Sequence, residues 1–245
     1  MQYFGGKQRI AKHIAEYINS TYCTHTHTIE QYVEPFCGSC NVASKVNIPK
    51  KILNDKHPYL IAMFKALQEG WIPPDVVSKD EYEYIKNNLY ENPALSGFVG
   101  FGCSFSGIWF SNYAKDNSGR NYAKNAHNSI LKKMKTLHNA KFISNDFYNL
   151  NFSNSIIYCD PPYKNTSPYN KNLLGEFPYD KFLEWVKEQS KNNIVLVSEY
   201  KYNLPEDATL ILEIPSKTDI RRGVHGERIE TIEVLYTYNK LKINT

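Results

Sequence analysis

The chain carries the stretch Ile156-Ile157-Tyr158-Cys159-Asp160-Pro161-Pro162-Tyr163, in which a short apolar run leads into an acid, two prolines and an aromatic ring. Residues 156–159 are apolar, β-branched or aromatic, and their number is typical of a buried strand. The prolines must end this strand, because each fixes its own φ angle and lacks an N–H group. Pro161 also holds Asp160 extended. The stretch therefore predicts a strand followed by a stiff loop with fixed hydrogen-bond acceptors.

These acceptors suit a planar aromatic amine. The Asp160 carboxylate and the Pro161 carbonyl can each accept one N–H group, while the Tyr163 ring can stack on the base. Such an amine is a poor nucleophile because its lone pair is delocalised, and two aimed acceptors stabilise the positive charge that develops during attack. The sequence thus predicts the alkylation of an exocyclic amine, with the catalytic residues Asp160, Pro161, Pro162 and Tyr163. A proline-stiffened turn after a core strand is the structural alternative.

Three further segments accompany this tetrapeptide, namely Tyr3-Phe4-Gly5-Gly6-Lys7, Val33-Glu34-Pro35-Phe36-Cys37-Gly38-Ser39-Cys40 and Ile52-Leu53-Asn54-Asp55. In order and spacing, the four segments resemble the motifs of the DNA adenine methylase (Dam-like) family. The resemblance implies an α/β fold, a Rossmann-like class I methyltransferase sheet that is mostly parallel with its last strand antiparallel, and an inserted target-recognition subdomain. It also implies transfer of a methyl group from S-adenosyl-L-methionine to the N6 amino group of a flipped adenine in double-stranded DNA.

A first strand is expected over residues 29–33, followed by a tight turn and a short helical stretch. Such loops bind nucleotides at the carboxyl ends of parallel strands, where glycine allows close approach and helix N–H groups face the ligand. The candidate cofactor-binding residues in this loop are Glu34, Phe36 and Gly38. The family form is commonly Phe-x-Gly-x-Gly, and here Cys40 stands in place of the final glycine.

The other cofactor-binding residues follow from the resemblance. In Dam-like enzymes the first segment contacts the methionine end of the cofactor, which implies Tyr3 and Lys7. Asp55, at the end of a second strand, is implied to hold the ribose hydroxyls, with capping of the next helix as the alternative. Asp146 and Phe147, after a strand over 141–144, are implied to hold the cofactor's adenine.

Residues 70–138 depart from the alternating pattern. A helix over 78–89 is expected to begin with a capping box, whereas neither a regular helix nor a flat strand explains the glycines and aromatics of 97–110. Basic and amide side chains follow on a loop, which suits phosphates and base edges. We therefore place target recognition here, with the DNA-binding candidates Lys115, Arg120, Asn121, Tyr122 and Lys124. Lys132, Lys133 and Lys135 add to the positive charge around this loop, and a solvated basic helix over 123–137 is the alternative.

The rest of the chain is expected to complete the sheet. We expect a lid over 164–175, a helix over 179–192 and a strand over 193–200 whose end lines the target pocket. A closing antiparallel pair is expected over 208–214 and 227–238. Residues 217–223 are interpreted as the loop between these last strands. Arg221 and Arg222 lie in it as candidates for DNA phosphate contact, with a solvated turn as the alternative.

Composition sets the wider limits. The 245 residues carry a net charge of +4, which permits a polyanionic partner, and are divided into a cofactor-binding part (1–69), a target-recognition insertion (70–138) and a catalytic part (139–245). Without a long apolar run or a signal peptide, a cytoplasmic protein is expected, and without heptads a monomer is expected. The resemblance implies a bacterial or phage-encoded protein, and a cognate restriction nuclease stays open. No metal is expected, because no second pair completes a zinc site with Cys37 and Cys40.

Three other activities remain open. Cytosine presents a similar exocyclic amine, so a cytosine-N4 DNA methyltransferase is the nearest rival, and an RNA methyltransferase is more remote. A non-catalytic DNA-binding protein on the same fold is the alternative from another class.

Overall fold

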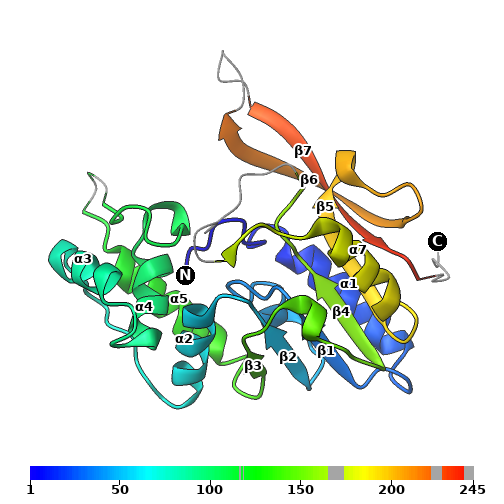
Figure 1. Ribbon diagram of the computed structural model, residues 1–245, viewed down its shortest axis with the longest axis horizontal. Coiled ribbons are helices and arrows are strands. Elements are labelled where there is room, and N and C mark those ends of the chain that lie inside the picture. The colour runs from blue at the N-terminus through cyan, green and yellow to red at the C-terminus, as the bar shows by residue number, and fades with distance from the viewer. Residues whose placement is uncertain (116, 118, 165–173, 222–227, 240–245) are drawn as a thin grey trace.

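The computed structural model describes residues 1–115, 117, 119–164, 174–221 and 228–239, with backbone alone at 216–221 and 228–231. A seven-stranded sheet forms its centre, in the order β3-β2-β1-β4-β5-β7-β6 (Figure 1). The strands are β1 (Gln31–Glu34), β2 (Lys51–Asn54), β3 (Lys141–Ile143), β4 (Ser155–Cys159), β5 (Ile194–Tyr200), β6 (Thr209–Arg221) and β7 (Arg228–Thr237).

The sheet is mostly parallel. β1 pairs in parallel with both β2 and β4, β2 with β3, and β4 with β5, whereas β7 pairs antiparallel with β5 and β6. The strand that closes the chain is therefore the one that runs against its neighbours. The predicted α/β fold class, with a mostly parallel sheet and an antiparallel last strand, is confirmed.

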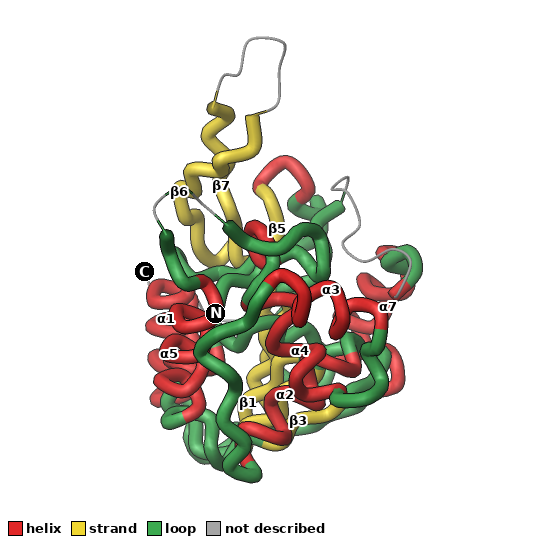
Figure 2. The backbone as a smooth tube through the Cα atoms, turned by 90° about the vertical axis from the view of Figure 1, so that its left-hand side faces the viewer, coloured by secondary structure: helices red, strands yellow, loops and turns green. Residues whose placement is uncertain are grey.

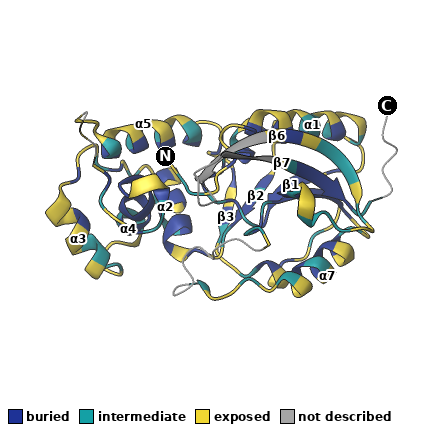
Figure 3. Ribbon diagram, turned by 90° about the horizontal axis from the view of Figure 1, so that it is seen from above, coloured by how far each residue is buried: buried dark blue, intermediate teal, exposed yellow. Residues whose placement is uncertain are grey.

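Helices cover both faces of this sheet, and α1 and α7 lie on opposite sides of it (Figure 3). The helices are α1 (Ala11–Thr24), α2 (Pro58–Gln68), α3 (Lys79–Asn87), α4 (Pro93–Gly102), α5 (Tyr122–Met134) and α7 (Tyr179–Gln189). Short 3-10 turns are η1 (Ala43–Lys45), η2 (Phe105–Gly107), η3 (Phe147–Asn149) and η4 (Lys201–Asn203). No helix in the described ranges is both long and apolar enough to cross a membrane.

Two hydrophobic clusters hold the layers together. Successive residues of β4 point to opposite faces, so Ile156 packs in the cluster that contains Ile14 of α1, whereas Ile157 packs with Phe182 and Val186 of α7. Every residue of β4 is buried. A strand that is apolar throughout suits a parallel sheet with both faces covered, and the sequence of β4 was interpreted in that way.

The first part of the glycine-rich segment, residues 97–102, is helical, contrary to expectation. α4 starts at Pro93 after the Asn92 side chain, which accepts a hydrogen bond from the Leu95 N–H group, and it runs to Gly102. A Cβ atom added at Gly100 would lie 2.3 Å from the Trp109 ring, and one at Gly97 would lie 2.1 Å from a backbone oxygen of α2. The glycines thus serve close packing, which outweighs their low helix propensity.

The closing hairpin is also longer than expected. β6 extends to Arg221, so residues 217–221 are paired strand rather than loop, and Arg221 is in register with Arg228. Figure 2 shows the far ends of β6 and β7 projecting beyond the body of the molecule. Arg222 lies outside the described residues, as do residues 165–173 of the expected lid.

Candidate active site

A cavity of about 900 Å³ lies at the carboxyl ends of the parallel strands. Its wall combines the N-terminal segment with the loops that follow β1, β2, β3 and β4. All the residues predicted to be catalytic or cofactor-binding line it, namely Tyr3, Lys7, Glu34, Phe36, Gly38, Asp55, Asp146, Phe147, Asp160, Pro161, Pro162 and Tyr163. The topology therefore brings segments that are far apart in sequence into one site.

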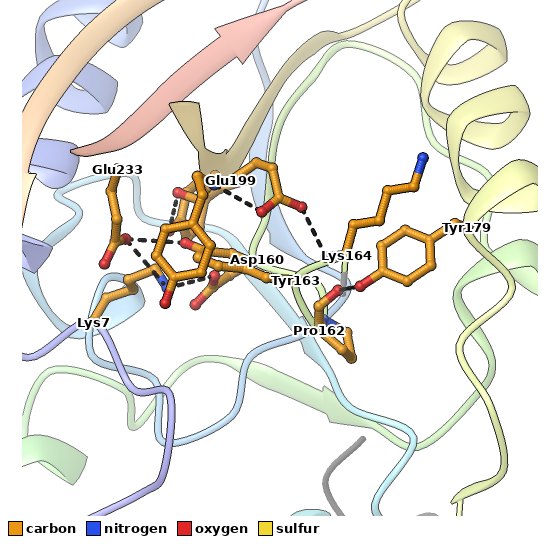
Figure 4. Close-up of polar contacts among 11 residues, drawn as sticks. Lys7, Asp160, Pro162, Tyr163, Lys164, Tyr179, Glu199 and Glu233 are labelled. Atoms are coloured by element: carbon orange, nitrogen blue, oxygen red, sulfur yellow. Dashed lines mark hydrogen bonds and ion pairs between the residues drawn. The ribbon is translucent and has the colours of Figure 1, made fainter. Parts of the chain in front are cut away.

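Asp160 is paired with a lysine at one end of this cavity. The Nζ atom of Lys7 lies 2.9 Å from Oδ1 of Asp160 and 3.4 Å from Oε2 of Glu233, and the Lys7 side chain is only 8% exposed (Figure 4). Glu233 comes from β7. One buried ammonium thus lies within ion-pair distance of two carboxylates, one in the loop after β4 and one on β7.

The Tyr163 ring is fixed on several sides. Its hydroxyl donates to Oε2 of Glu233 at 3.0 Å, its ring meets the Tyr200 ring edge-on with centroids 4.6 Å apart, and the Lys7 ammonium lies 4.4 Å from its centroid. These contacts fix the orientation of the Tyr163 ring in the cavity.

Hydrogen bonds from neighbouring elements also hold the backbone of the loop after β4. Oε2 of Glu199, at the end of β5, accepts the Lys164 N–H group at 3.2 Å, and the Tyr179 hydroxyl donates to the Pro162 carbonyl (Figure 4). Among the described residues, no backbone N–H group outside the helices and strands donates to the Pro161 carbonyl. That carbonyl can therefore act as the second acceptor beside Asp160.

Burial and the neighbouring Lys7 charge have opposite effects on the pKa of Asp160. Burial raises the pKa of Asp160 to about 6, Glu233 adds to the rise, and Lys7 and the Tyr163 hydroxyl limit it. Burial alone would lower the pKa of Lys7, but the two carboxylates outweigh it and raise that pKa above its ordinary value. Near neutral pH, Asp160 is therefore mostly ionised and Lys7 is protonated.

The loop after β1 follows a strained path. Gly38 has a φ angle of +45° and Cys40 one of +56°, both in the left-handed region that favours glycine. Cys40 thus adopts the conformation that the family's usual glycine would supply. The Tyr3 ring lies against Gly38, where an added Cβ atom would be 3.0 Å from the ring, so this position needs a residue without a side chain.

A lysine of α5 holds the same loop. Lys133 Nζ donates to the Ser39 carbonyl, and it lies 2.8 Å from Oδ1 of Asn41. The sequence placed Lys133 among solvated or DNA-facing charges, and that interpretation was wrong. A basic residue on an amphipathic helix carries no signal that distinguishes a solvated side chain from one that crosses to a neighbouring loop.

Asp55 links two loops at the cofactor end. Its carboxylate accepts the Gly38 N–H group at 2.9 Å and the His57 N–H group at 2.9 Å. Burial raises the pKa of Asp55 to about 6, and these two donors oppose the rise. The side chain that caps α2 is His57, which accepts from Leu60, so Asp55 is not the cap of that helix.

Glu34 is the most perturbed acid in the cavity wall. It is buried and accepts the Tyr32 hydroxyl at 2.6 Å. Burial raises the pKa of Glu34 to about 8, although the Tyr32 hydrogen bond opposes this. Glu34 is therefore largely neutral at pH 7 and adds little negative charge to the cavity.

The adenine side of the predicted cofactor site combines an ion pair with aromatic rings. Asp146 lies 3.0 Å from Nζ of Lys56, and the rings of Phe36 and Phe147 are 5.5 Å apart between centroids. Phe147 is also packed in the cluster on the α7 face. The sequence analysis did not identify Lys56 as a site residue, although it directly follows the predicted Asp55.

The DNA-binding candidates lie apart from this cavity. Lys115, Arg120 and Lys124 are exposed, and the Arg120 guanidinium lies 5.8 Å from the Tyr122 ring centroid. Asn121 caps α5 by accepting the Lys124 N–H group, and it also donates to the Asp75 carbonyl. Its amide is thus engaged in the helix start, so a base contact by Asn121 stays a prediction that requires this cap to open.

Glu233 and Glu199 are two further site residues that sequence reasoning missed. The end of the strand over 193–200 was expected to line the target pocket, which is a usable signal for Glu199 and Tyr200. No such signal existed for Glu233, because apolar and acidic residues alternate on both faces of β7.

The chain is similar to one family of DNA methyltransferases and to two named proteins. Residues 3–94 match the family model of the D12 class N6 adenine-specific DNA methyltransferases. The chain is 24% identical over 221 residues to the type II methyltransferase M.FokI of Planomicrobium okeanokoites, covering 77% of this chain and 32% of that protein. It is 27% identical over 206 residues to the modification methylase StsI of Streptococcus sanguinis, covering 71% and 30%. The chain spans about a third of the length of these relatives.

Among solved structures, the chain resembles a candidate RNA methyltransferase from Pyrococcus horikoshii with a TM-score of 0.37 and 10% identity, over 92% of this chain and 83% of that one.

Proposed function

We propose that this chain is a D12 class N6 adenine-specific DNA methyltransferase and that it transfers the methyl group of S-adenosyl-L-methionine to the N6 atom of an adenine flipped out of double-stranded DNA. One observation carries the proposal. The acceptor pair of Asp160 and Pro161 opens into the same cavity as the loops that follow β1, β2 and β3. A methyl donor and a base could therefore meet there.

The cavity fits such a donor. Its volume of about 900 Å³ is at the upper end of small-molecule sites, which leaves room for a nucleoside cofactor and a base together. Gly38 leaves the wall open beside Tyr3, and Asp55 and Asp146 supply carboxylates for ribose and amino groups. Tyr3 and Lys7 would hold the methionine end. When bound, the cofactor supplies an electrophilic methyl group on a sulfonium.

The chain's own residues act on the target amine. Asp160 and the Pro161 carbonyl would each accept one N–H group and stabilise the positive charge that builds on the nitrogen. Tyr163 would stack on the base, in an orientation set by Glu233 and Tyr200. The base must leave the duplex, because these acceptors line a cavity that a stacked base cannot enter.

The partner would be double-stranded DNA, held by exposed basic residues. Lys115, Arg120, Tyr122 and Lys124 are proposed to contact it, together with Asn121, Arg221 and Arg222. The relatives' names place them among modification enzymes, which supports a restriction-modification setting with a cognate nuclease. We propose that the chain acts in the cytoplasm as a monomer and that residues 70–138 form the target-recognition part.

The test is to incubate the full chain with unmethylated genomic DNA and labelled S-adenosyl-L-methionine, and then to digest the DNA and identify the labelled nucleoside. We expect N6-methyladenine. Labelled N4-methylcytosine would overturn the target base, and label found on RNA alone would overturn the substrate. Cofactor binding without any label on nucleic acid would favour a non-catalytic DNA-binding protein.

A further inference from the structure

We propose that Glu233 is a positioning residue for the methyl transfer, because it holds Tyr163 in place and offers Lys7 a second carboxylate so that Asp160 can receive the target amine. This inference rests on the proposed function and deepens it. Glu233 is expected to act through Tyr163 and Lys7 rather than on the substrate.

The sheet places Glu233 at the catalytic end. On β7 it is in register with Tyr200 of β5 and with Ile214 of β6, and its side chain is 13% exposed. The same oxygen, Oε2, accepts the Tyr163 hydroxyl at 3.0 Å and lies 3.4 Å from Nζ of Lys7 (Figure 4). Its carboxylate therefore touches both a predicted catalytic residue and the partner of Asp160.

Lys7 pairs with the carboxylate that would accept the target amine, and Glu233 offers Lys7 a second carboxylate. Its ammonium lies 2.9 Å from Oδ1 of Asp160, so it competes with the target amine for part of the acceptor capacity of this carboxylate. Because Lys7 is only 8% exposed, releasing it from Asp160 without another partner would leave a buried charge unpaired, which is costly. Glu233 already lies within ion-pair distance, so Lys7 can shift toward it without losing a counter-ion.

The charges also favour the reaction. Lys7, Asp160 and Glu233 together carry one net negative charge when all three are ionised, and this set faces the space where positive charge would build on the amine. With glutamine at position 233 the set would be neutral. Lys7 would then have Asp160 as its one carboxylate within this set.

The pH dependence follows from the groups around Asp160. They are Lys7 and Tyr3 of the N-terminal segment, Glu34 of β1, Tyr158 and Cys159 of β4, Tyr163 of the loop and Glu233 of β7. Glu233 raises the pKa of Asp160, and Lys7 and Tyr163 lower it. Removal of the Glu233 charge should therefore lower this pKa, whereas removal of the Tyr163 hydroxyl should raise it.

The experiment compares Glu233→Gln with the parent chain in single-turnover methylation of DNA across pH 5 to 9. We expect a loss of about tenfold in the rate at pH 8, the order expected when about one hydrogen bond is lost from the transition state, with little change in the KM for S-adenosyl-L-methionine. The acid limb should move to lower pH in Glu233→Gln and to higher pH in Tyr163→Phe.

Two further variants serve as controls for this experiment. Glu213→Gln, on the neighbouring strand β6 and paired with Lys201 at 2.7 Å, should leave rate and pH profile unchanged. Glu233→Asp keeps the charge and should keep the acid limb close to that of the parent, even if Glu233→Gln fails to fold.

The proposal is overturned if Glu233→Gln matches the parent in both rate and profile, or if Glu233→Asp shifts the acid limb to lower pH. A parent chain that makes no methyladenine would instead refute the proposed function, so the two failures can be told apart.

Discussion

Lys7 and Asp160 are the single residues that we expect to set the pH dependence of the proposed methyl transfer. Burial raises the pKa of Asp160 to about 6, and Lys7 is the main group that limits this rise. Asp160 must be ionised to accept an N–H group from the target amine. The proposed activity should therefore increase as the pH rises through about 6, and it should level off above that value.

The first prediction concerns Lys7→Met. Without the ammonium, the pKa of Asp160 should rise above that of the parent, so the acid limb of the methylation rate should move to higher pH. The measurement is the pH profile of kcat at saturating cofactor. Lys12→Met is the control, because Lys12 is 75% exposed on α1 and should leave the profile unchanged. An acid limb that stays in place would show that Lys7 does not govern Asp160.

At the scale of elements, α4 and α5 connect the predicted recognition part to the cavity. α4 packs its glycines against α2 and Trp109, and α5 extends Lys133 to the loop after β1. A substitution in α4 should therefore change the stability of the protein, and one in α5 should change the loop after β1.

The second prediction tests the packing of α4. Gly100→Ala would normally stabilise a helix, but here its Cβ atom would lie 2.3 Å from the Trp109 ring. We expect a destabilisation of about 1–3 kcal/mol in urea unfolding, as for other overpacked cores. Asn128→Ala, at an exposed position of α5, should stay within about 0.5 kcal/mol of the parent. A stabilised Gly100→Ala variant would contradict the packing described here.

The third prediction compares two neighbouring lysines of α5. Lys133→Met removes the bonds to Ser39 and Asn41, so the loop after β1 should be less ordered and the Kd for S-adenosyl-L-methionine should rise about tenfold, the effect of roughly one charge-assisted bond. Lys132→Met should bind like the parent, because Lys132 is exposed. Equal affinities in calorimetry for both variants would exclude a role for Lys133 at the cofactor end.

Sequence patterns predicted those elements whose signal is local. β4 is a short apolar run ended by two prolines, and α3 begins with the expected capping box of Ser78 and Glu81. The acids Asp55 and Asp160 follow apolar strands, so their place at one edge of a parallel sheet could be foreseen. Cys40 also takes the left-handed conformation of the glycine that it replaces.

What the sequence could not predict depends on contacts between distant segments. Glu233 lies within ion-pair distance of Lys7, although the two residues are far apart in the sequence. A strand with acids on both faces does not reveal which acid faces the cavity. The helical state of residues 97–102 depends on Trp109 and α2, which pack on glycines that would otherwise disfavour a helix. Local propensity carries no information about either contact.

At the scale of the whole molecule, the predicted recognition part and the sheet share one hydrophobic cluster. Phe98 of α4 and Ile130 of α5 belong to the same buried cluster as Ile14 of α1 and Tyr32 of β1. α5, which carries the proposed DNA contacts Tyr122 and Lys124, thus shares a buried cluster with the layer that supports the cavity. The division at residues 69 and 138 stays a prediction, and this shared core indicates that the parts fold together.

The central claim is that the cavity binds cofactor through one set of residues and activates the amine through Asp160. The most direct measurement is single-turnover methylation of DNA by Asp160→Asn, beside cofactor binding by calorimetry. We predict a rate loss of at least about a hundredfold, the scale for one aimed transition-state partner, with a Kd within about threefold of the parent. Asp207→Asn, an exposed partner of Lys187, should behave like the parent. A near-parental methylation rate in Asp160→Asn would contradict the account.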